Sequence, residues 1–226
     1  MKYKVEFDLE LVKNPYKGLF IAIEGLDASG KSTQAKILSQ SLTEKGQTVV
    51  VHNPFEGEIG QFVRSILSGE KKIDPIAMQY LINANRQVQQ EDIKKHLKEG
   101  HVVIIDRYIW SAPVYALVDT GLNFNKADAL LCSLNVLSMY NSFIMPDTTF
   151  FLKISTKTAI SRLDGLDKKK EIYENEELLE KVSLSYEWIT KKFNDEFTIL
   201  DGEESVEEVT SQIMNKVDLL FQEKKK

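Results

Sequence analysis

The sequence predicts a doubly wound α/β fold, in which a five-stranded parallel sheet is covered by helices on both faces. Short apolar runs rich in β-branched residues alternate with longer segments of helical spacing. This alternation indicates parallel strands, because such strands are joined by crossover helices. The chain has 226 residues, 42% of them hydrophobic and 28% charged, which is enough for one such domain and short for two.

Five runs have the composition and length of strands, and the segments between them have the spacing of helices. The predicted strands are residues 19–23, 48–51, 102–105, 149–152 and 197–200. The spacing of Ala35, Leu38 and Leu42 predicts a helix after the first strand, and that of Ala77, Leu81, Ala84 and Val88 predicts one before the third. In the last segment, Ser205 is positioned to cap a helix with a continuous apolar face.

Nothing between the predicted strands has the composition of a linker, so we expect residues 19–226 to form one domain. Residues 1–18 precede it as an extension to which the sequence gives no role. A charged stretch with a glycine, at about 163–172, has the character of a mobile loop between two helices.

Composition excludes several classes of function. The net charge is -5 and there is no basic stripe, which argues against a nucleic-acid partner. No apolar run is long enough for a membrane span, and the N-terminus lacks a secretory pattern, so we expect a cytoplasmic protein. Cys132 is the single cysteine, and His52, His96 and His101 lack metal-ligand spacing, so we expect no metal site among them.

A glycine-rich motif follows the first predicted strand and begins the first predicted helix. Residues 25–32 fit G-x-x-x-x-G-K-[ST], the P-loop pattern, in the context that the pattern requires. Backbone N–H groups of such a loop surround phosphate oxygens, while the lysine neutralises the β- and γ-phosphates and the serine binds Mg²⁺. The predicted ATP-binding residues are Gly25, Ala28, Ser29, Gly30, Lys31, Ser32 and Thr33.

Asp106, Arg107 and Tyr108 follow the third predicted strand, at the sheet edge where open α/β folds bind ligands. Asp106 is placed to hold Mg²⁺ through water, and Arg107 to bridge to a transferred phosphate. A surface ion pair at the end of a strand is the simpler interpretation, but a neighbouring P-loop favours the functional one.

Several motifs together resemble the thymidylate kinase family in their order and spacing, from about residue 19 to the C-terminus. They are Ile23-Glu24-Gly25-Leu26-Asp27, Ala84-Asn85-Arg86, Asp106-Arg107-Tyr108 with Ser111 and Tyr115, and Pro146-Asp147. The resemblance implies ATP- and Mg²⁺-dependent phosphorylation of a nucleoside monophosphate, with dTMP as the favoured acceptor, by a homodimer.

The same resemblance assigns acceptor contacts residue by residue. It places Asp27 near the acceptor nucleotide, Arg64 and Arg107 on its phosphate, and Arg86 at the base edge. The full set is Asp27, Pro54, Arg64, Ile82, Arg86, Arg107, Ser111 and Tyr115. Arg86 and Ile82 are four residues apart on one helix, so both can line one pocket. A loop-capping Asp27, a solvated Arg64 and a core Tyr115 remain alternatives.

The loop near Lys168, Lys169 and Lys170 corresponds to the family's lid, with Arg162 just before it. Relatives that lack an arginine in the P-loop use basic lid residues instead, and Ala28 stands at that P-loop position. We therefore expect Arg162 to act in catalysis with Lys31, Asp27 and Arg107. The lysine run is equally consistent with a solvated surface.

Three sites depart from the family pattern and leave base selectivity open. His52-Asn53-Pro54 replaces the usual Arg-Glu-Pro, Ile82 replaces a stacking aromatic, and Ala116 replaces a base-reading glutamine. Uridylate, cytidylate or a modified deoxynucleotide are thus possible acceptors, with Trp110 or Tyr108 as substitute stacking partners.

Two other functions compete. A deoxynucleoside kinase would need a carboxylate base after the second strand, for which Glu56 or Glu58 is available. A nucleotide-dependent switch would be favoured by Asn125-Lys126-Ala127-Asp128, which matches N-K-x-D. Because that string follows no strong strand, we interpret it as the start of a helix.

Overall fold

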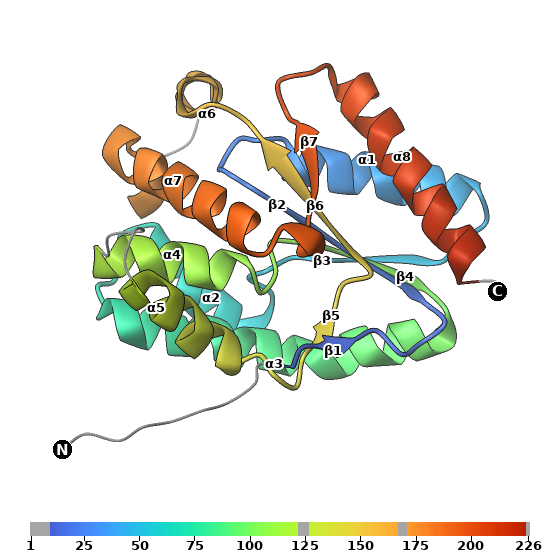
Figure 1. Ribbon diagram of the computed structural model, residues 1–226, viewed down its shortest axis with the longest axis horizontal. Helices are drawn as coiled ribbons and strands as arrows, with labels where there is room; N and C mark the ends of the chain where they lie inside the picture. Colours follow the sequence, from blue (N-terminus) through green and yellow to red (C-terminus); the bar gives the residue numbers. More distant parts are fainter. Residues whose placement is uncertain (1–9, 122–126, 167–170, 225–226) are drawn as a thin grey trace.

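A computed structural model describes residues 10–121, 127–166 and 171–224, and it confirms the predicted fold. Five parallel strands form the main sheet in the order β3-β4-β2-β6-β7 (Figure 1). Their bounds are β2 (Leu19–Gly25), β3 (Val49–His52), β4 (Val102–Asp106), β6 (Thr148–Lys153) and β7 (Thr198–Asp201). All five predicted runs are strands, and their ends differ from the prediction by at most two residues.

Helices cover both faces of this sheet (Figure 1). They are α1 (Lys31–Glu44), α2 (Gly57–Leu67), α3 (Pro75–Glu99), α4 (Ser111–Thr120), α5 (Ala127–Ser138), α6 (Thr156–Asp164), α7 (Glu176–Lys192) and α8 (Val206–Glu223), with short 3₁₀ turns η1 (Ile172–Glu174) and η2 (Asn194–Glu196). Within the described ranges, none of these helices has both the length and the apolar composition needed to cross a membrane.

Strand β2 lies at the centre and divides the core into two layers. Leu19, Ile21 and Ile23 pack with α1 and α8 on one face, whereas Phe20 and Ala22 pack with α3, α4 and α7 on the other. This division follows from the two-residue repeat of a strand. A strand buried on both faces fixes the loop that follows it, and that loop is the glycine-rich motif.

Local sequence signals define the helix ends as expected. Ser205 caps α8 with its side chain on the Glu208 N–H, in a reciprocal capping box. Asp74 accepts hydrogen bonds from the first turn of α3, and Pro75 occupies the first helical position. Helix α3 is 25 residues long, and it packs against α2, α4 and β4.

Part of the N-terminal extension packs on the domain. Strand β1 (Val12–Lys13) pairs in parallel with β5 (Ile144–Met145) in a second, small sheet. Asn14 donates from Nδ2 to Asp147 Oδ2 at 2.7 Å, and Lys224 Nζ lies 2.9 Å from Asp147 Oδ1. Asp147 thus ties both chain ends to the start of β6.

Candidate active site

The glycine-rich loop joins β2 to α1 in a conformation that requires its small residues. Gly25 has φ 149°, and a Cβ there would lie 2.7 Å from the carbonyl oxygen of Leu152. Gly30 has φ 96° and precedes α1 with no side-chain cap, so the first N–H groups of this helix are not bonded by a capping side chain. Buried Ser29 Oγ has no hydrogen-bond partner. These free donors make the loop a binding site for an anion.

Lys31 points back into this loop. Its Nζ donates to the Leu26 carbonyl oxygen at 2.6 Å, and the side chain is buried. Burial, and then the positive charge of Arg107, lower the pKa of Lys31 from 10.5 to about 8. A buried cation next to a cluster of unbonded N–H groups is suited to binding a polyphosphate.

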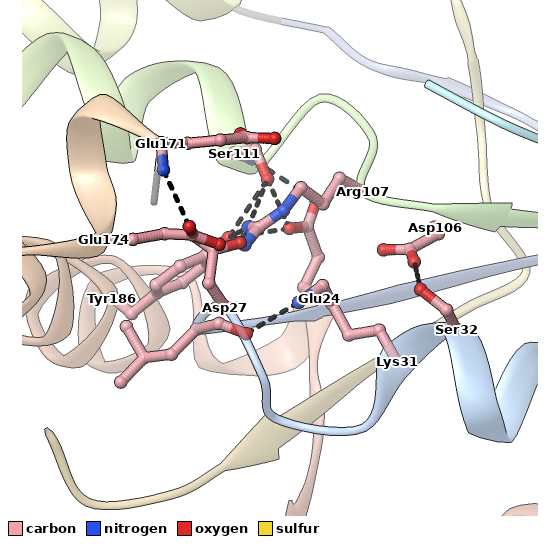
Figure 2. A network of polar contacts seen from close by, with 11 residues as sticks. Glu24, Asp27, Lys31, Ser32, Asp106, Arg107, Ser111, Glu171, Glu174 and Tyr186 are labelled. Atoms are coloured by element: carbon pink, nitrogen blue, oxygen red, sulfur yellow. Dashed lines mark hydrogen bonds and ion pairs between the residues drawn. The ribbon is translucent and has the colours of Figure 1, made fainter. Parts of the chain in front are cut away.

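The predicted metal ligands lie side by side (Figure 2). Ser32 Oγ donates to Asp106 Oδ2 at 2.5 Å, which joins the start of α1 to the end of β4. A hydroxyl and a carboxylate oxygen are ligands that Mg²⁺ accepts. The residues present therefore fit a magnesium ion.

Arg107 lies across the loop from Lys31, with φ 65°. Its Nη2 is 2.7 Å from Asp27 Oδ1, and its Nη1 donates to the Tyr186 hydroxyl at 2.9 Å. Two of the four predicted catalytic residues, Asp27 and Arg107, thus meet in one ion pair (Figure 2). A bound phosphate could compete with Asp27 for the guanidinium.

Glu24 organises this side of the site, and the sequence analysis gave it no role. It is fully buried, and its Oε1 accepts from the Tyr108 N–H at 2.8 Å. Its Oε2 accepts from Ser111 Oγ at 2.6 Å and from the Tyr186 hydroxyl at 2.9 Å. The sequence signal for Glu24 was a carboxylate one residue before the end of an otherwise apolar strand. No comparable sequence signal pointed to Tyr186, which lies on α7.

A cleft adjoins the Asp27–Arg107 pair on the side away from Ser32. It is lined by Asp27, Pro54, Phe55, Leu67, Met78, Gln79, Ile82, Arg86, Arg107, Ser111, Ala112, Tyr115, Glu171 and Tyr173. The lining contains all the expected acceptor residues except Arg64, and it confirms that Ile82 and Arg86 share one pocket. Tyr108 and Trp110 do not line this cleft, and both are completely buried in the protein core. The suggestion that they stack on a base is therefore wrong.

Arg64 lies outside the cleft. Its side chain is exposed, and its guanidinium carbon is 5.8 Å from the centre of the Phe55 ring, which does line the cleft. Helix α2 places Val63 and Ile66 in the core, so its Arg64 faces solvent.

Gln79 is a cleft residue that the sequence analysis missed. It lies on α3, three residues before Ile82 and seven before Arg86, and therefore on the same helix face. The side chain is 6% exposed, and no hydrogen bond of good geometry reaches its amide nitrogen or oxygen, although the Asp119 carboxylate is near. A buried amide whose hydrogen bonds are poorly aligned is costly unless a ligand satisfies it.

Arg162 reaches the P-loop from α6. Its Nη1 donates to the Ala28 carbonyl oxygen at 3.3 Å and its Nη2 to the Gly202 oxygen at 3.1 Å. Together with Thr33 it lines a hollow beside the loop. Lys168, Lys169 and Lys170, on which the lid expectation also depended, lie outside the described residues.

The residues that would support the competing functions are not part of the cleft. Glu56 accepts from the Asn53 N–H, and neither it nor exposed Glu58 lines the cleft. Asn125 and Lys126 lie outside the described residues, and α5 begins at Ala127, in line with the interpretation of this string as a helix start.

Comparison with known proteins gives one family throughout. Residues 23–213 match the family described as thymidylate kinase. A thymidylate kinase of Thermosipho africanus is 36% identical over 208 residues, covering 88% of this chain and 98% of the relative. A probable thymidylate kinase of Methanocaldococcus jannaschii is 32% identical over 197 residues, covering 87% and 94%.

A solved structure of the Candida albicans thymidylate kinase superimposes with a TM-score of 0.72 at 26% identity, covering 89% of this chain and 92% of that one. With its motifs, fold and relatives in agreement, the chain belongs to the thymidylate kinase family.

Proposed function

We infer that this phosphotransferase moves the γ-phosphoryl group of ATP to dTMP and so forms dTDP and ADP. The observation that carries the inference is the position of Asp27 and Arg107, between the phosphate-binding loop and the cleft. An acceptor phosphate at Arg107 is within reach of a γ-phosphate at Lys31. An oxygen of the acceptor phosphate attacks the γ-phosphorus as the bond to the β–γ bridging oxygen breaks, and that oxygen leaves on ADP.

The reaction needs positioning and charge stabilisation, and no covalent nucleophile. Lys31 and the loop N–H groups would hold the donor phosphates. Ser32 and Asp106 would hold Mg²⁺, which supplies positive charge to the transferred group. Arg162 is placed to add a cation from the opposite side, and Arg107 is placed to contact both reacting phosphates.

Gln79 and Arg86 would read the base. Thymine presents carbonyl oxygens and one N–H on its pairing edge, and an amide can bond to one of each. Arg86 has donors only, and its Nη1 already donates to the Tyr140 hydroxyl at 3.0 Å. A donor-only group favours the O4 carbonyl of thymine over the amino group of cytosine. Apolar Ile82 and Met78 complete this end of the cleft.

An acceptor panel tests the function. The protein is assayed with ATP and Mg²⁺ on dTMP, dUMP, UMP, dCMP, CMP and thymidine, with ADP release as the readout. We expect dTMP to have the highest kcat/KM and cytosine nucleotides to be at least about tenfold poorer. Turnover of thymidine in preference to dTMP would refute the inference and favour a nucleoside kinase.

We also propose a cytoplasmic homodimer. Ile76 and Tyr80 on α3 and Leu131 on α5 are 61%, 64% and 54% exposed and surround a hollow between these helices. An apolar face of this kind can pair with the same face of a second copy about a two-fold axis. Light scattering should give twice the chain mass, and Tyr80→Glu should reduce it to the monomer. A monomeric unmodified protein would contradict the pairing.

A further inference from the structure

Two histidines of the chain, His96 and His101, lie side by side, and Asp92 links His96 to the more distant His52. His52 ends β3, His96 lies in the last turns of α3, and His101 immediately precedes β4. Gly100 ends α3 with φ 87°, and the His101 N–H donates to the His96 carbonyl oxygen at 3.0 Å. This turn folds His101 back beside His96, an arrangement that sequence spacing could not indicate.

Three potential ligand atoms form a nearly regular triangle. The Nδ1 atoms of His96 and His101 are 3.0 Å apart, and Oε2 of Glu99 is 3.7 Å from the first and 3.4 Å from the second. Zinc binds imidazole nitrogen and carboxylate oxygen at about 2.0–2.2 Å, so ligand atoms in a tetrahedral site are roughly 3.3–3.5 Å apart. The triangle therefore has the size of one face of such a site.

Carboxylates lie behind the imidazoles. Asp92 is 3.5 Å from Nε2 of His96 through one oxygen and 3.4 Å from Nε2 of His52 through the other. A carboxylate in this position orients a ligating imidazole and leaves its other nitrogen free for a metal. His52 is 5% exposed, and neither of its ring nitrogens has a hydrogen bond. Its Nδ1 lies 3.5 Å from Glu56 Oε2, so a carboxylate flanks each nitrogen of the ring.

The cluster is open to solvent and distant from the catalytic residues. The side chains of His96, Glu99 and His101 are 21%, 45% and 25% exposed, which leaves room for a water ligand. His101 precedes the first residue of β4, whereas Asp106 is its last. The cluster and the proposed magnesium ligands thus lie at opposite edges of the sheet.

We propose that His96, Glu99 and His101 form a site for a divalent transition ion of the zinc class, with Asp92 as the residue that orients His96. Two imidazoles and one carboxylate suit Zn²⁺, Co²⁺ or Ni²⁺, whereas Mg²⁺ takes oxygen ligands. The ion would link the end of α3 to the start of β4. Since α3 also carries Gln79, Ile82 and Arg86, binding would stabilise the helix that lines one side of the cleft.

Titration of metal into the untagged full chain tests this site. After chelator treatment and without nucleotide, Zn²⁺ is added in a calorimeter and Co²⁺ under visible spectroscopy, which reports four-coordinate geometry. We expect one equivalent to bind at micromolar or lower concentration. His96→Gln and His101→Gln should each weaken binding by at least about a hundredfold, and Asp92→Asn by about 10–100-fold.

Two controls separate this site from others. Glu91→Gln, at an 87% exposed carboxylate on the same helix, should leave the affinity unchanged. Asp106→Asn should also leave it unchanged, because that residue belongs to the other edge. If His96→Gln does not fold, Glu99→Gln and His101→Gln carry the test, with thermal unfolding in chelator as the folding check. Absence of saturable binding below about 100 μM, equal affinity in the ligand variants, or loss in Asp106→Asn would overturn the proposal.

Discussion

Replacement of Lys31 by methionine should stabilise the protein without nucleotide while abolishing most of its activity. The ammonium group is buried near the positive charge of Arg107, and it donates a hydrogen bond to the Leu26 oxygen. Methionine retains most of the side-chain volume without the charge. The unmodified protein thus keeps an unfavourable charge that its proposed ligand would neutralise.

The pKa of Lys31 gives the size of the effect. A fall in this pKa from 10.5 to about 8 means that the charged lysine destabilises the folded state by roughly 3 kcal/mol relative to a lysine with the ordinary pKa. Loss of the bond to the Leu26 oxygen offsets about 1 kcal/mol. We therefore expect Lys31→Met to raise the free energy of unfolding by about 2 kcal/mol at pH 7, which raises Tm by roughly 4–8 °C in a chain of this length.

The gain depends on pH in a direction that the linkage relation fixes. The folded-state pKa lies below the unfolded one, so the unfolded chain binds more protons between pH 8 and 10.5. The stability of the unmodified protein therefore rises with pH in that window relative to the variant. The advantage of Lys31→Met should be complete below pH 8 and should vanish by about pH 10.5.

Thermal unfolding of the two proteins at pH 7, 9 and 10 measures this difference. Lys36→Met is the control, because Lys36 is an exposed lysine on the same helix. At saturating ATP and dTMP, Lys31→Met should lower kcat by at least about a hundredfold. If Lys31→Met is less stable than the unmodified protein at pH 7, or if its gain in stability is unchanged at pH 10, burial of the Lys31 charge does not destabilise the folded state.

Three further changes test the framework of the site. Glu24→Gln should cost about 1–3 kcal/mol of unfolding free energy and lower kcat, because the amide cannot accept all the hydrogen bonds of the carboxylate; an unchanged Tm would contradict its organising role. Gly25→Ala should lower the free energy of unfolding clearly more than Gly46→Ala, since both glycines have positive φ but only Gly25 has neighbours that a Cβ would meet. Equal losses in the two variants would contradict a role for close packing at Gly25. Glu203→Gln should weaken the contact between Glu203 and the start of α6. Hydrogen bonds from the Ser155 backbone N–H and, to a smaller extent, from the Ser155 and Thr158 hydroxyls lower the pKa of Glu203 from 4.5 to about 2. The Tm difference between Glu203→Gln and its parent should be largest above pH 4.5 and shrink as pH falls toward 2.

The sequence predicted those parts of the fold and site that local chemistry determines. The P-loop, the five strands and the cap at Ser205 each depend on a short run of residues, and each lies where it was expected. Gln79 could not be predicted in this way. A glutamine on a helix is ordinary, and its burial in the cleft follows from the packing of α3 against α4 and α2.

The histidine cluster and Tyr186 escaped prediction for different reasons. The cluster depends on the turn at Gly100, which folds His101 back beside His96. Tyr186 meets β2 through Glu24 because a crossover brings these distant segments together. Arg64 shows that a matching motif can also suggest too much. The motif predicted a contact with the acceptor phosphate, but α2 directs the Arg64 side chain to solvent.

Backbone strain marks the point where the two halves of the site meet. Among the residues that the structure describes, Ala28 and Arg107 are the only non-glycine residues with positive φ, at 60° and 65°. Such conformations cost about 1–3 kcal/mol each and persist only where surrounding contacts impose them. Here the contacts are visible: Arg162 donates to the Ala28 oxygen, while Glu24 binds the N–H that follows Arg107.

Each strained residue is therefore held by a charged side chain from another element. Since Glu24 immediately precedes the P-loop and also fixes the turn after β4, one buried carboxylate sets the distance between the donor loop and Arg107. A shift of either segment would misplace Arg107 relative to Lys31, and in a reaction that depends on positioning such a shift reduces the rate directly. This coupling explains why a buried carboxylate is retained near the end of an otherwise apolar strand.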